Sequence, residues 1–182
     1  MNERYMILLS GPAGSGKTTI ALKLWRTLPD RPAYICLDYL KNMIYEAKAS
    51  DYNLDLARIN ALSLVRNYLD AGHNVIVVKA FAKYEYVQPF VEECSHRGIP
   101  AYYFKLIAPL NVLIKRNQDR HTYDSNRLLS EMRWRKYQAS DARIIEIYEH
   151  HMANTHSFGS ELDTSQYSID ETISHILGII RQ

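Results

Sequence analysis

Near its start the chain carries the stretch Gly11-Pro12-Ala13-Gly14-Ser15-Gly16-Lys17-Thr18, followed by Thr19. An apolar segment of strand length, residues 5–9, precedes it, and apolar residues at helical spacing follow it over 19–25. A glycine loop in this position can point successive backbone N–H groups inward, and the first turn of the helix adds its unpaired N–H groups and the positive end of its dipole. The stretch therefore predicts a strand, an anion-binding loop and a helix in direct succession.

Two side chains of this stretch complete a phosphate site. Lys17 supplies a mobile positive charge that can reach the β- and γ-phosphates of a nucleotide, and Thr18 offers a hydroxyl to Mg²⁺. The pattern G-x-x-x-x-G-K-[ST] is the Walker A sequence. Through this pattern the chain resembles the P-loop nucleotide-binding proteins. The alternative is a glycine turn that merely begins a helix, and it is disfavoured because three of the seven glycines lie in this one loop.

Composition favours one ordinary globular domain over residues 1–182, long enough to bury a core. Cys36 and Cys94 lie in apolar contexts without metal-ligand spacing, which is typical of a reduced, cytoplasmic setting. No signal peptide and no run of about 18 apolar residues is evident, so we expect no membrane span. The net charge of +2 argues neither for nor against nucleic acid, and the seven histidines do not form a ligand set.

The rest of the chain alternates between predicted strands and helices. Strands are expected over residues 33–37, 74–78, 100–107 and 158–163, and helices over 39–48, 54–69, 86–97, 109–120, 127–151 and 169–180. This alternation predicts an α/β fold with a five-stranded parallel sheet. Right-handed crossovers then place the glycine loop at the carboxyl ends of the strands.

Asp38 directly follows the second predicted strand, so we expect it at the same sheet edge as the glycine loop. A carboxylate there can accept the proton of a substrate hydroxyl, or it can hold a water of the Mg²⁺ shell. The alternative is an N-cap for the next helix, which is a common use of aspartate.

Positive charge concentrates in the window Lys115–Lys136, which holds seven basic and three acidic side chains. Arg116 and Arg120 lie four residues apart and share one face of the predicted helix. Arginines that close over a phosphoryl group stabilise its charge during transfer. The window, with a polar break over 121–126, therefore predicts a mobile lid, and the alternative is a solvated helical face.

The glycine loop, Asp38 and the pattern R-x-x-x-R together resemble the small P-loop kinases. These include the gluconate and shikimate kinases, chloramphenicol phosphotransferase, the zeta toxins and the polynucleotide 5′-kinases. Ile107-Ala108-Pro109 resembles the segment that leads into their lid, and residues 162–165 before 169–172 resemble their fifth strand and final helix. The resemblance implies a three-layer P-loop NTPase fold with a helical lid.

The resemblance also implies roles for single residues. Gly11–Thr19, Lys17 among them, would bind the phosphates of ATP, with Thr18 as a ligand of Mg²⁺. Arg116 would lie near the adenine and Arg120 would reach the phosphates from the lid, while Thr164, Ser165 and Gln166 would border the adenine. Asp38 would be the base or a partner of the metal.

One position departs from the pattern of the relatives. Many of them carry an acid at the end of the third strand, where this chain has Lys79. Lys79 is therefore expected to bind an acidic or phosphorylated substrate. Asp38 and Lys41 are also expected among the substrate-binding residues. The alternative for Lys79 is a surface lysine whose stem covers apolar groups.

These features predict an ATP- and Mg²⁺-dependent phosphotransferase that moves the γ-phosphate to a hydroxyl of a small molecule. A first alternative is a kinase of nucleic-acid 5′ ends, suggested by Arg133-Trp134-Arg135-Lys136-Tyr137. A second is a nucleotide-binding regulator without an acceptor, which the missing acid of the third strand leaves open. The acceptor and the oligomeric state are not predicted.

Overall fold

The computed structural model describes residues 4–41, 43, 54–123, 140–153 and 159–181, with side chains of 120–123 excluded. Its five strands form one parallel sheet in the order β2-β3-β1-β4-β5. They are β1 (Met6–Ser10), β2 (Ala33–Cys36), β3 (Val75–Val78), β4 (Ala101–Ile107) and β5 (Ser160–Asp163). The predicted α/β fold with a five-stranded parallel sheet is confirmed.

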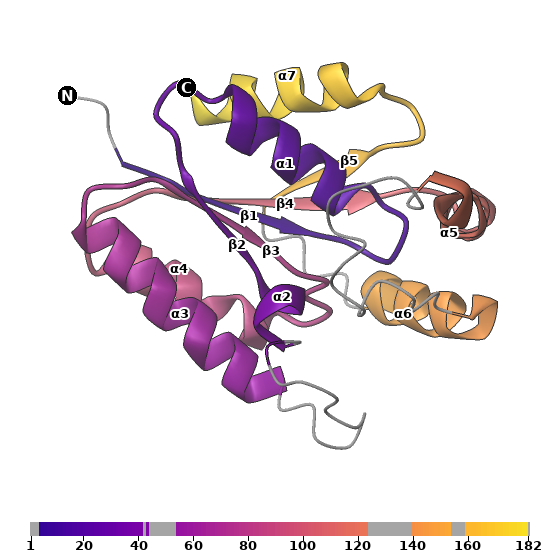
Figure 1. Cartoon of the computed structure of the whole chain (residues 1–182), viewed down its shortest axis with the longest axis horizontal. Coiled ribbons are helices and arrows are strands. Elements are labelled where there is room, and N and C mark those ends of the chain that lie inside the picture. The colour runs from indigo at the N-terminus through magenta and orange to yellow at the C-terminus, as the bar shows by residue number, and fades with distance from the viewer. Residues whose placement is uncertain (1–3, 42, 44–53, 124–139, 154–158, 182) are drawn as a thin grey trace.

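Helices cover both faces of this sheet (Figure 1). They are α1 (Lys17–Thr27), α2 (Leu37–Lys41), α3 (Leu54–Asp70), α4 (Gln88–Ser95), α5 (Leu110–Tyr123), α6 (Asp141–Ala153) and α7 (Ile169–Ile180). The helices α1 and α7 lie on one face and α3 and α4 on the other, while α5 and α6 lie beyond the carboxyl edge of the strands. The fold therefore has three layers, with the sheet between two layers of helices.

The central strand β1 is buried along its whole length because it faces helices on both sides. Successive side chains of a strand point to opposite faces. Met6 and Leu8 accordingly pack toward α3 and α4, and Ile7 and Leu9 pack toward α1 and α7. A parallel strand covered on both faces needs this unbroken apolar run, and the same holds for Val75–Val78 in β3.

The last helix matches its predicted bounds because its start is specified by local hydrogen bonds. Ser168 Oγ accepts from the N–H of Glu171 at 3.3 Å, and Glu171 Oε2 accepts from the N–H of Ser168 at 2.8 Å. This reciprocal capping box satisfies two N–H groups that a helix start leaves unpaired. It fixes where the chain turns back over the sheet after β5.

Two predicted boundaries were wrong. The second strand ends at Cys36, because its ladder with β3 stops at the pair Cys36 and Val78, so Asp38 lies in the first turn of α2 rather than at a strand end. The helix expected to end at about Arg120 continues to Tyr123, so the polar stretch 121–126 begins inside α5. Solvated polar side chains leave the backbone ladder intact when no glycine or proline interrupts it. Residues 124–139, and with them most of the expected helix from 127, lie outside the described part.

The helix predicted within 86–97 is α4, which begins at Gln88 after a 3₁₀ turn over Tyr84–Tyr86. Pro89 then lies in its first turn, where a missing N–H does no harm. Among the described residues, no helix combines the length and apolar character needed to cross a membrane.

Candidate active site

The glycine loop is clamped between β4 and α5. Gly11 has φ 136° and a side chain there would collide with the carbonyl oxygen of Leu106. Gly14 has φ 81° and its added Cβ would lie 2.8 Å from the carbonyl oxygen of Leu113. Both positions thus require glycine for backbone angle and for space. The loop is held in a defined shape from both sides.

The start of α1 fits an anionic ligand. Gly16 precedes the helix in the left-handed conformation, and an added Cβ there would meet no heavy atom within 4 Å, so this side of the loop is open. Lys17 Nζ lies over the loop and donates to Pro12 O at 2.7 Å. The hydroxyl of Ser15 is buried and has no hydrogen-bond partner in the described part of the chain. Unpaired N–H groups, an ammonium and a spare hydroxyl are the donor set that phosphates require.

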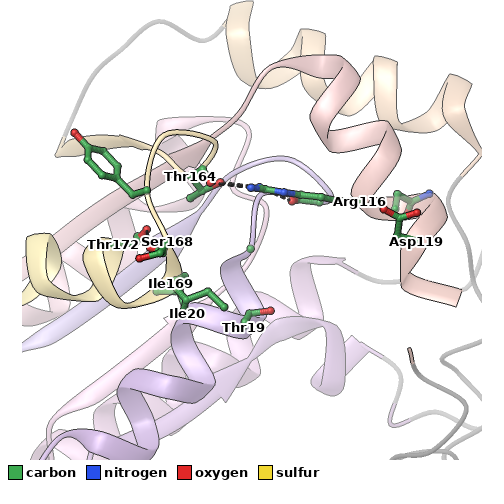
Figure 2. A pocket seen from close by; sticks show the side chains of 12 residues that line it. Thr19, Ile20, Arg116, Asp119, Thr164, Ser168, Ile169 and Thr172 are labelled. Carbon is green, nitrogen blue, oxygen red and sulfur yellow. Dashed lines mark hydrogen bonds between the residues drawn. The ribbon is translucent and has the colours of Figure 1, made fainter. Parts of the chain in front are cut away.

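Arg116 of α5 ties the loop to the segment after β5 (Figure 2). Its Nη1 donates to Thr164 Oγ1 at 2.9 Å and its Nη2 donates to Thr164 O at 2.8 Å, while Nη1 also lies 3.4 Å from Gly14 O. The single proton of the Thr164 hydroxyl is shared between Ile107 O at 3.1 Å and Ser15 O at 3.2 Å. Three distant segments therefore meet at one guanidinium and one hydroxyl.

A cavity of about 550 Å³ opens beside this junction (Figure 2). Gly14, Gly16 and Thr19 line it from the loop and α1, and Arg116 and Thr164 line it from the other two segments. Ser165 and Gln166, also expected at an adenine, are not among its lining residues. Asp163 Oδ1 instead accepts from the N–H and the hydroxyl of Ser165, which shapes the turn.

Sequence reasoning missed part of this cavity wall. Its further lining residues are Ile20, Asn117, Asp119, Tyr167, Ser168, Ile169 and Thr172. The capping pattern at Ser168 was a usable signal, because it places the start of α7 directly after the turn that carries Thr164. Asn117 and Asp119 share the helix of Arg116, but nothing in their local sequence marks them.

Asp38 and Lys79 meet at the carboxyl edge of the sheet. Lys79 directly follows β3, its N–H donates to Leu9 O at 3.2 Å, and its Nζ lies 2.5 Å from Asp38 Oδ1. Burial raises the pKa of Asp38, but the Lys79 ammonium, with Lys17 and Lys41, outweighs burial and holds this pKa below its ordinary value. The carboxylate therefore stays charged and paired at neutral pH.

A second cavity, of about 450 Å³, lies beside this ion pair. Lys41 and Lys79, which the sequence assigns to substrate binding, both line it. Burial, followed by the charges of Lys79 and Arg143, lowers the pKa of Lys41 despite the opposing effect of Asp38. Arg58, Arg143 and His151 also line the cavity and were missed, since they come from ordinary amphipathic helices without a motif.

His151 is the most buried polar group of this second cavity. Its ring is 2% exposed, and its Nε2 has no hydrogen-bond partner among the residues that the structure describes. Burial, with the charges of Lys17, Lys105 and His150, lowers the pKa of His151 to about 3. The imidazole is therefore neutral at physiological pH and can exchange a hydrogen bond but not a charge.

The expected lid residues are placed only in part. Arg120 lies in α5, but its side chain, like residues 124–136, falls outside the described part of the chain. The lid over 115–136 and the contact of Arg120 with phosphates stay predictions.

Residues 6–143, about three quarters of the chain, match the sequence model of the AAA domain family. The chain belongs to the AAA domain family. A comparison with curated proteins found no significant relative of this AAA domain. Its fold is shared with solved structures of small kinases, as the resemblance predicted.

Three such structures cover nearly all of this AAA domain. The APS kinase of Mycobacterium tuberculosis, solved with AMPPNP and APS, has TM-score 0.65 at 17% identity over 99% of both chains. Shikimate kinase from Bacteroides thetaiotaomicron has TM-score 0.64 at 16% identity over 98% of this chain and 99% of that one. A gluconokinase from Sinorhizobium meliloti 1021 has TM-score 0.64 at 15% identity, covering 98% and 92%. The TM-scores show that the chain shares the P-loop NTPase fold with these structures. At 15–17% identity the likeness does not extend to the reaction, which is argued from the site.

Proposed function

We propose that the chain is an ATP-dependent kinase that transfers the γ-phosphate of ATP to a hydroxyl group of a small molecule. The observation that carries this proposal is the pair of cavities at the carboxyl edge. One is lined by the glycine loop, Arg116 and Thr164, and the other lies at the Asp38–Lys79 pair. The charge of Lys17 lowers the pKa of both Asp38 and His151, so the glycine loop and the second cavity are electrostatically coupled.

Each part has a role in this reaction. The loop N–H groups and Lys17 hold the phosphates, while Arg116 and Thr164 border the space for the base. Thr18, in the first turn of α1, would hold Mg²⁺, which supplies neutralisation of phosphate charge when bound. The second cavity holds the acceptor with its hydroxyl toward the loop.

Transfer then needs little covalent chemistry from the protein. The acceptor oxygen bonds to the γ-phosphorus while the bond from that phosphorus to the bridging oxygen breaks, and ADP leaves. Asp38 receives the proton of the attacking hydroxyl and later returns it to water. Arg120 would add positive charge to the equatorial oxygens from the lid.

Incubation with Mg²⁺ and γ-labelled ATP against a panel of hydroxyl metabolites and oligonucleotides tests this proposal. Transfer of label to a small hydroxyl compound, abolished by Lys17→Ala, is the expected result. Label on oligonucleotide 5′ ends alone would favour the nucleic-acid kinase. Release of phosphate with no labelled acceptor would favour the nucleotide-binding regulator. That alternative follows from Lys79, which stands after β3 where many relatives carry an acid.

A further inference from the structure

The second cavity is strongly basic. Five basic side chains line it, against the single carboxylate of Glu146, among the described residues. They come from α2, α3, α6 and the segment after β3, and they are Lys41, Arg58, Lys79, Lys83 and Arg143. Four separate elements thus direct positive charge into one small space, and Glu146 is the single carboxylate among the described lining residues. The electrostatic potential of this cavity therefore favours an anionic ligand over a neutral one.

Most of the carboxylates that pair with these cations do not line the cavity, and Glu146, which does line it, is about half exposed. Lys83 pairs with Glu85 at 3.3 Å and Arg143 pairs with Glu146 at 2.5 Å, with all four side chains about half exposed. Ion pairs this exposed are weak because water screens them, so a ligand anion competes with them readily.

Lys79 differs from these exposed lysines and arginines. Its side chain is 19% exposed, whereas that of its partner Asp38 is 57% exposed. An anion inside the cavity therefore meets a largely buried ammonium whose present partner can return to water. The contact of Lys79 with Asp38 is itself a charge-assisted hydrogen bond. A ligand anion in the cavity would give Lys79 a partner of the same kind, while the more exposed Asp38 carboxylate gains contact with water.

The remaining wall suits a small organic skeleton. Leu37, Ala57, Phe81 and Tyr86 supply apolar surface, and the Arg58 guanidinium lies 4.1 Å from the centre of the Tyr86 ring. The buried Nε2 of His151, without a partner in the described structure, offers a hydrogen bond to a polar group of the ligand. The cavity combines positive charge, apolar surface and one unused polar atom.

We propose that the acceptor is an anionic hydroxy compound whose phosphate, sulfate or carboxylate group pairs with Lys79 and thereby releases Asp38 to receive the hydroxyl proton. This rests on the proposed kinase function. The acceptor oxygen bonds to the γ-phosphorus, the bond to the bridging oxygen of ADP breaks, and the hydroxyl proton moves to Asp38 and then to water. A neutral acceptor leaves Lys79 on Asp38, so the same proton transfer is slower. Lys79, which replaces the acid that many relatives carry after β3, thereby couples the charge of the acceptor to the rate of proton transfer to Asp38.

A binding experiment tests the anion site without relying on turnover. With the loop filled by Mg²⁺ and AMPPNP, sulfate is titrated and binding is followed by the change in melting temperature and by amide chemical shifts. We expect sulfate to bind wild type and to bind Lys79→Met about tenfold more weakly or worse. Lys79→Arg, which keeps the charge, should restore binding. Lys23→Met is the matched control, because Lys23 pairs with Asp170 away from the cavity. Equal sulfate affinity in Lys79→Met and wild type would overturn the inference.

Kinetics separate this inference from the proposed function. Glycerol 3-phosphate is compared with glycerol, and gluconate with glucose, using labelled ATP. The inference expects the anionic member of a pair to have the higher kcat/KM, and Lys79→Met to reduce that preference. Transfer that favours neutral members, with a ratio unchanged in Lys79→Met, refutes the inference but leaves the kinase intact. Sulfate binding at Lys79 without transfer to any hydroxyl compound in the wider panel refutes the kinase instead.

Discussion

Replacing Thr164 by valine should loosen the nucleotide cavity from its scaffold. Valine keeps the shape of threonine and removes only the hydroxyl. That hydroxyl accepts from Arg116 Nη1 at 2.9 Å, and its proton is shared between Ile107 O and Ser15 O. Thr164 is 7% exposed, so water cannot replace these bonds without local opening.

The lost bonds set the size of the effect. A hydrogen bond between neutral groups contributes about 1 kcal/mol net, and one to a charged group about 1.5–3 kcal/mol. Arg116 keeps its bond from Nη2 to Thr164 O at 2.8 Å, and Nη1 stays 3.4 Å from Gly14 O, so the lower end applies. We expect the free energy of unfolding to fall by about 2 kcal/mol. For a chain of this length, the melting temperature should then fall by roughly 4–8 °C.

Calorimetry and urea unfolding of wild type, Thr164→Val and Thr164→Ser measure this effect. Serine keeps the hydroxyl and loses one methyl group, so it is the matched control. Isothermal titration with Mg²⁺ and AMPPNP should also show weaker binding to the valine variant, because Arg116 and Gly14 border the same cavity. A valine variant as stable as wild type, or a serine variant as unstable as the valine one, would refute the reasoning.

Three other changes test the remaining parts of the site. Lys17→Ala should abolish ATP turnover and leave the circular-dichroism melting curve unchanged, since Lys17 contacts the loop and not the core. Lys23→Ala is the control. Turnover of Lys17→Ala at the wild-type rate would contradict the role of Lys17 in phosphate binding. Asp38→Asn should lower the rate of transfer by about 10²–10⁴-fold with little change in stability, and rescue at high Mg²⁺ would instead identify a partner of the metal. The pKa of His151 in the folded chain is lowered from 6.5 to about 3. As pH falls below about 6.5, the imidazole of His151 is therefore protonated in the unfolded state before it is protonated in the folded state. The free energy of unfolding should fall by up to about 1.4 kcal/mol per pH unit in this range. His151→Phe should flatten this slope between about pH 6.5 and 5 in urea unfolding, and an unchanged slope would show that the imidazole is not buried in its neutral form.

Local signals in the sequence were enough for most of the fold. The apolar run before the glycine loop, the run Val75–Val78 and the capping residues Ser168 and Glu171 each specify an element through interactions within a few residues. The loop itself was predictable because its glycines and Lys17 lie within one short stretch whose pattern is typical of phosphate binding. Crossover handedness then placed all strand ends at one edge.

The second cavity shows where sequence reasoning stops. Lys79 and Asp38 are 41 positions apart, and their pairing depends on β2 and β3 being neighbours in the sheet. Arg58 and Arg143 reach the cavity from helices whose sequences show only amphipathic periodicity. The helix α5 runs past its expected end near Arg120 because polarity alone does not break a helix. Asp38 lies in α2 because the length of the strand before it depends on pairing with β3.

The bond from the Thr164 hydroxyl to Ser15 O joins residues 149 positions apart in the chain. A ribosome therefore delivers the glycine loop long before it delivers Thr164, which lines the cavity beside that loop. The loop also rests on β1, which pairs with both β3 and β4 and so waits for the chain to pass residue 107. If the chain binds ATP as proposed, the nucleotide cannot guide the early stages of folding on the ribosome. Binding of ATP as proposed would stabilise only a chain in which Thr164 has already reached Ser15, so it would favour complete molecules over partial ones.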